Sequence, residues 1–139
     1  MIGLILGWSI LNSARQITKA AAEPNILPAG QKIKINDRYS FQCVFPRKPR
    51  LGAAVLKINV FDAALPAADK KTAALIILAG SDMPAMRGHH AAPPQPVKTN
   101  KNKDYLFPVD LVMRGEWEIV LSFQENDREI YRGVILLKV

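Results

Sequence analysis

The chain has 139 residues, a formal net charge of +7 and a single cysteine. This length suits one domain with one buried core, and one cysteine excludes an intramolecular disulfide. The positive charge suits an anionic membrane surface or an acidic partner, whereas nucleic acid is not expected as a partner, because no Lys/Arg cluster is interleaved with aromatic residues.

The first residues are almost all apolar from Met1 to Leu11. This run is shorter than the roughly 20 residues that a membrane-spanning helix needs, but it has the length of the apolar region of a signal peptide. Ala20 and Ala22 would then precede a cleavage site at Glu23. We predict that residues 1–22 are a signal peptide or an N-terminal membrane anchor, and that the protein is periplasmic or exposed on the cell surface. The alternative is an apolar helix packed on the domain.

Alternating apolar and polar residues predict seven strands between residues 23 and 139. The expected strands are residues 31–35, 39–45, 54–61, 72–78, 105–113, 116–123 and 129–139. Leu75–Leu78 is a continuous apolar run, typical of a strand covered on both faces. Pro108 indicates an edge position or a bulge. Residues 62–71 are expected to be a long loop, and the prolines of residues 91–96 predict an irregular segment. The spacing favours one all-β domain, an immunoglobulin-like two-sheet antiparallel β-sandwich.

Two further features of the first half have both a structural and a functional interpretation. Cys43 shares a strand face with Tyr39, Phe41 and Phe45, which predicts a small buried hydrophobe rather than a thiolate ligand or a redox thiol. The segment Pro46–Arg50 contains two prolines and three cations. It is expected to be a solvated loop, with contact to anionic lipid or to an acidic partner as the functional alternative.

The segment Met83-Pro84-Ala85-Met86-Arg87-Gly88-His89-His90 brings two thioethers and two imidazoles within eight residues. Cu(I) is a soft ion that favours thioether sulfur and also accepts imidazole. Pro84 restrains Met83 toward an extended conformation, and Gly88 permits a turn. Adjacent residues of an extended segment point to opposite sides, so at most one of His89 and His90 is expected to join the methionines. Met113, at the end of a predicted strand, is a candidate for a third sulfur ligand. Zinc is less favoured, because no carboxylate or cysteine ligand belongs to this set.

The order of these features resembles the YtkA-like and FixH-like extracytoplasmic domains, over residues 52–139. The matching features are Gly52–Phe61, Leu75–Leu78, Met83–Met86, His89-His90, Tyr105–Met113, Arg114–Trp117 and Arg132–Val139. The basic loop Pro46–Arg50 and the alanine-rich segment Asp62–Ala68 have no counterpart in that pattern. The resemblance implies a periplasmic immunoglobulin-like sandwich of a group associated with copper handling or with the assembly of copper-containing respiratory oxidases, whose members are not, as a class, enzymes.

The sequence therefore predicts a copper-binding accessory or metallochaperone-like protein with Cu(I) as its metal. The predicted ligands are Met83, Met86, His89, His90 and Met113. The alternative is a non-metal interaction module that docks on a membrane or respiratory complex, with the methionines serving as core residues. No enzymatic activity is expected, because no nucleophile, base and orienting group occur at a recognisable spacing.

Overall fold

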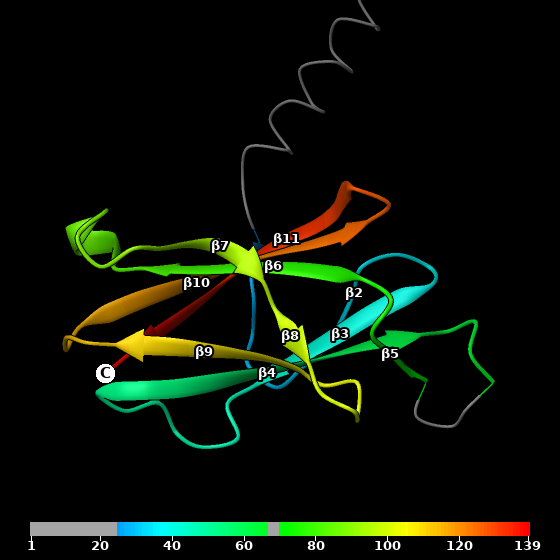
Figure 1. Cartoon of the computed structure of the whole chain (residues 1–139), viewed down its shortest axis with the longest axis horizontal. Helices are drawn as coiled ribbons and strands as arrows, with labels where there is room; N and C mark the ends of the chain where they lie inside the picture. Colours follow the sequence, from blue (N-terminus) through cyan, green and yellow to red (C-terminus); the bar gives the residue numbers. More distant parts are fainter. Residues whose placement is uncertain (1–24, 67–69) are drawn as a thin grey trace, which may run out of the picture.

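The computed structural model describes residues 25–66 and 70–139, which form two β-sheets packed face to face (Figure 1). The pairing between neighbouring strands is antiparallel except for one short parallel pair, so the predicted all-β sandwich is confirmed. Residues 1–22, predicted to be a signal peptide or an anchor, lie outside the described residues. No helix among the described residues is long and apolar enough to cross a membrane.

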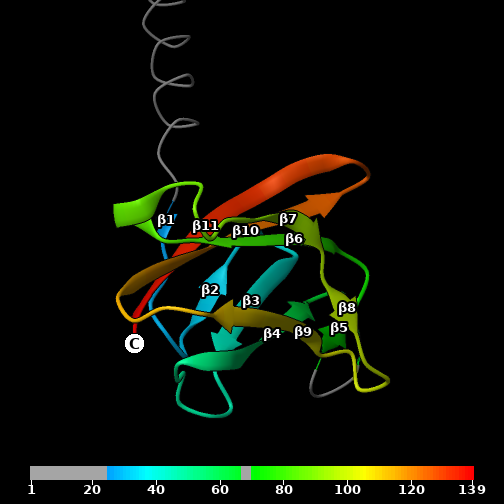
Figure 2. The same ribbon diagram turned by 60° about the vertical axis from the view of Figure 1, so that its left-hand side comes forward.

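Five strands form the first sheet and six form the second. The first sheet has the order β1 (Asn25–Ile26), β11 (Arg128–Lys138), β10 (Glu116–Glu125), β6 (Ile76–Asp82) and β7 (Ala92–Pro96). The second has the order β2 (Lys32–Lys34), β3 (Tyr39–Val44), β4 (Gly52–Asp62), β9 (Tyr105–Leu111) and β8 (Lys98–Thr99), and β5 (Lys71–Thr72) pairs with β4. Both views show the chain passing directly from β7 in one sheet to β8 in the other (Figure 2).

The core lies between the sheets and is built by alternation along the long strands. Every second residue of β3 is buried, and the same pattern holds through most of β4 and β10. Phe41 and Phe123 meet across the two sheets with ring centroids 4.3 Å apart. Cys43 is buried in this core, as predicted. Its burial raises the pKa of the thiol to about 12, so at neutral pH it is a protonated hydrophobe rather than a reactive thiolate.

Seven strands have five or more residues, but they are not quite the seven predicted. The segment 31–35 forms only a three-residue strand, whereas the proline-rich segment expected to be irregular forms β7. The prediction that Leu75–Leu78 is covered on both faces is wrong. Leu75 and Ile77 are buried, but Ile76 is 49% exposed, because only one face of the first sheet packs on the second.

Gly80 explains how three prolines can belong to a strand. The register between β6 and β7 shifts between Ala79 and Ser81, which flank this glycine. A Cβ atom on Gly80 would lie 2.8 Å from the carbonyl oxygen of Ala92 and 3.1 Å from the nitrogen of Pro94. The missing side chain therefore lets β7 lie close over β6, and β7 is the edge strand of its sheet, a position at which proline is tolerated.

Candidate metal-binding site

The methionine and histidine segment connects β6 to β7 at one end of the sandwich. Met83 has the extended backbone predicted from Pro84, with φ −100° and ψ 116°. It is followed by a single 3-10 turn, η1 (Pro84–Met86), in which the amide of Met86 donates to the carbonyl of Met83. Gly88 has φ +84°, a conformation that favours glycine, and so provides the predicted turn toward the histidines.

Charged groups hold this segment against β10. The carboxylate of Asp82 accepts hydrogen bonds from the amides of Met83 (2.8 Å) and Gly88 (3.4 Å). Arg87 forms an ion pair with Glu118 on β10 and lies 3.6 Å from Asp82. The hydrogen bond that Arg87 donates to the carboxylate of Glu118 is the main cause that raises the pKa of Arg87. The segment is thus held at Met83 and again at Arg87 and Gly88, although much of its surface faces solvent.

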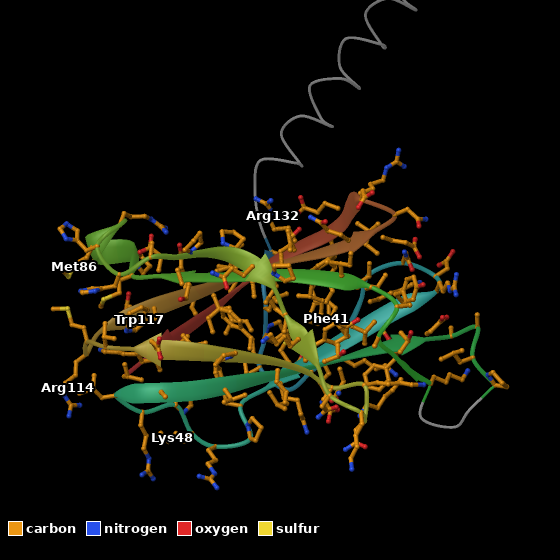
Figure 3. All side chains as sticks on the ribbon, in the orientation of Figure 1. Phe41, Lys48, Met86, Arg114, Trp117 and Arg132 are labelled. Carbon is orange, nitrogen blue, oxygen red and sulfur yellow. The ribbon has the colours of Figure 1, made fainter. Side chains whose placement is uncertain are left out.

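Trp117 is where the separate parts of the candidate site meet. Its side chain is almost fully buried, and its indole Nε1 donates to the carbonyl of Met113 at 2.9 Å. The ring of His90 lies beside it, with centroids 6.3 Å apart and planes inclined by 39°. Figure 3 shows Trp117, Met86 and Arg114 at the same end of the molecule. In the sequence, Trp117 ends one of the features that carry the resemblance, whereas the structure adds that His90 and the carbonyl of Met113 meet its indole.

The three methionines differ in their exposure. Met83 is 3% exposed and belongs to the core, and its terminal methyl lies 3.0 Å from the position that a Cβ atom would take on Gly115. Met86 is half-buried at the margin of that core. Met113 is 41% exposed in the turn after β9. Met83 is therefore enclosed in the core, Met86 lies at its margin and Met113 is exposed to solvent. All three lie at the end of the sandwich that contains Trp117.

The two histidines also differ. His89 is exposed, whereas His90 is half-buried and turned to Trp117. His90 also lines an open groove of about 610 Å³ between β7 and β9, together with Asp110 and Val112. The structure thus brings Met83, Met86, His90 and Met113 to one end of the sandwich. It leaves His89 exposed to solvent.

The structure is thus a β-sandwich that carries an imidazole beside a buried tryptophan, with three methionines at the same end of the molecule. Among residues 25–66 and 70–139, no three His, Cys, Asp or Glu side chains come together as a possible metal site. A comparison with models of protein families finds none that matches the chain. Comparisons with curated proteins and with solved structures likewise find no significant match.

Proposed function

We propose that this protein is an extracytoplasmic copper-binding accessory protein that holds Cu(I) at the Trp117 end of the sandwich and releases it to a partner. The proposal draws on the resemblance to the YtkA-like and FixH-like domains. The observation that carries it is that two connections of the chain meet beside Trp117. In the β6–β7 connection, Met83 lies against Gly115 and His90 lies beside the indole, and the turn that contains Met113 accepts the indole hydrogen bond.

The chemistry of these groups matches a soft, exchangeable ion. Thioether sulfur binds Cu(I) without losing a proton, and a neutral imidazole adds a nitrogen ligand. Three of the proposed ligands have access to solvent, namely Met86, His90 and Met113. Met83 is enclosed and would bind the ion only from the core side. The face of an indole attracts a cation, so Trp117 would add a weak contact. Weak neutral ligands near the surface suit an ion that must pass to another protein.

A Cu(I) competition titration of the full chain under reducing conditions tests the proposal. We expect one ion per chain, with shifts of the methionine methyl and His90 ring NMR signals. His90→Asn and Met86→Leu should each weaken the affinity by more than about tenfold, because removing a ligand costs at least as much as removing a group that orients one. His89→Asn is the matched control and should leave the affinity unchanged. Equal effects of the two histidine variants, or no binding near stoichiometric Cu(I), would reject the site.

The burial of Met83 supports a second candidate, a non-metal interaction module. In that case the methionines fill the end of the core, and the exposed apolar residues Ile26 and Leu136 of the first sheet would contact a membrane complex. Absence of Cu(I) binding, with a stability loss on Met83→Ala typical of a core residue, would favour this candidate.

A further inference from the structure

The charges of the protein are unequally divided between its two sheets. The second sheet and its connections, residues 30–66, 70–72 and 97–112, carry twelve Lys or Arg and four Asp or Glu, a net charge of +8. The first sheet and its connections, residues 25–27, 76–96 and 116–139, carry four Lys or Arg and six Asp or Glu, a net charge of −2. The positive charge of the described chain is thus concentrated on one layer.

Strand register places many of these cations on one surface, the outer face of the second sheet. Residues paired across neighbouring strands share a face. Lys98 pairs with Leu106, Leu106 with Lys57, and Lys57 with Val44. In the next rows Lys32 pairs with Gln42, and Lys34 pairs with Ser40. The inward residues of these strands are the buried ones. The lysines therefore project away from the core, in rows across the sheet.

The basic loop Pro46–Arg50 extends the same face. Figure 3 shows Lys48 on the side of the molecule that is opposite Arg132 of the first sheet. Apolar residues lie among these cations: Leu51, next to the loop, is 49% exposed, and Val55 on β4 is 45% exposed. We call this surface the basic face; it comprises Lys32, Lys34, Lys57, Lys98, Arg47, Lys48, Arg50, Leu51 and Val55.

Few of these cations are neutralised within the protein. Of the twelve Lys and Arg of the second layer, three form ion pairs with described residues: Lys34 with Asp37, Arg38 with Asp62 and Lys71 with Asp104. Lys32 lies over the ring of Phe61, 4.3 Å from its centroid. A broad face with several unneutralised cations and a few exposed aliphatic side chains is complementary to the headgroups and the upper acyl region of an anionic bilayer.

We propose that the basic face docks the domain on an anionic lipid surface. Each Lys or Arg near such a surface contributes to binding, and the contribution decays within a Debye length of about 8 Å at physiological salt. Leu51 and Val55 would insert among the headgroups, while the cations contact phosphates. The proposal is independent of copper binding, because the basic face belongs to the second sheet and the 83–90 segment to the first.

Vesicle co-sedimentation of the full chain tests the proposal, with phosphatidylcholine alone and with about one third phosphatidylglycerol. We expect binding that requires the anionic lipid and weakens with added salt. The triple variant Arg47→Gln, Lys48→Gln, Arg50→Gln should bind at least about tenfold more weakly. The matched triple Arg128→Gln, Arg132→Gln, Lys138→Gln removes the same charge from the other layer and should stay within about twofold. If the loop variant fails to fold, Lys32→Gln, Lys57→Gln, Lys98→Gln replaces it.

Three outcomes would overturn the proposal. Equal losses in the two triple variants would mean that net charge alone drives association. Equal binding to neutral and anionic vesicles would mean that the basic face has no part. Tighter binding to polyglutamate or to double-stranded DNA than to the anionic vesicles, at the same ionic strength, would assign the face to a soluble polyanion.

Discussion

Strand β9 connects two ends of the sandwich that differ in their side chains. One end carries a network of charged and amide groups, and the other carries methionines and a histidine. Asp104, just before β9, accepts hydrogen bonds from Lys71 (2.6 Å) and Asn100 (3.2 Å) and another from Asn59. The hydrogen bond from Lys71 is the main cause that lowers the pKa of Asp104 to about 2. Both oxygens of the Asp104 carboxylate have partners, and the cluster ties β4, β5 and the turn before β9 together.

The other end of β9 leads to Met113 and Trp117, where the thioether and imidazole side chains are held by packing rather than by polar contacts. Among the described residues, the imidazole of His90 has no hydrogen-bond partner, only the neighbouring indole. A polar network with all its partners satisfied stabilises the fold, whereas donors held by packing alone are free to bind something else. The charged cluster around Asp104 therefore stabilises the fold, whereas the Met113 end has donor atoms available for a ligand.

Trp117→Ala should lower the free energy of unfolding more than any other variant considered, and its structural changes should be concentrated at the Met113 end. It removes the largest buried side chain of the domain, and such truncations cost about 3–5 kcal/mol of unfolding free energy. Urea denaturation followed by circular dichroism measures the loss. Trp117→Phe keeps most of the volume and should cost clearly less. A loss below about 1 kcal/mol for the alanine variant would show that the end is not organised around this residue.

Gly80→Ala should have an intermediate effect, transmitted to His90 through β7. The added methyl would meet backbone atoms of Ala92 and Pro94, which cannot move as a side-chain tip can, so we expect a loss of about 1–3 kcal/mol. NMR should show shifts at His90 and along β7 but little change at Asp104. Gly133→Ala is the comparison variant. The atoms nearest to its methyl would belong to the side chain of Leu27, which can shift more readily than backbone, and a loss as large as that of Gly80→Ala would contradict the explanation.

Asp104→Asn should have the smallest effect, and one that depends on pH. The folded state lowers the pKa of this carboxyl to about 2, so the folded state favours the ionised form. The stabilisation is complete above the unfolded pKa, near pH 4, and is lost as the pH falls toward 2. We expect the variant to be less stable by roughly 1–2 kcal/mol at pH 7, with the difference vanishing near pH 2. Thermal unfolding across this range measures it.

Asp110→Asn is the matched control for that experiment, because Asp110 lies on β9, the strand that follows Asp104, but is exposed and makes no ion pair among the described residues. It should change stability little at any pH. A constant difference between Asp104→Asn and the parent protein across the whole range would mean that the carboxylate charge is not what stabilises this end.

Much of the fold could be predicted from the sequence, because alternation along a strand records which face is buried. That pattern correctly assigned most of β3, β4, β9 and β10 and the burial of Cys43. It failed for β7, whose prolines conceal a strand made possible by Gly80 on another strand. It also overestimated the burial of Ile76, since a short apolar run does not reveal how many faces of a sheet are covered.

The sequence by itself determined which residues have soft donor atoms and how they are spaced, because side-chain chemistry and local backbone restraint, such as that of Pro84 on Met83, are properties of the chain. Only the tertiary structure decided that Met83 is enclosed, that His90 rather than His89 lies beside Trp117, and that most cations lie on one layer. Those outcomes depend on strand pairing between segments far apart in the chain, which sets the neighbours that each side chain meets.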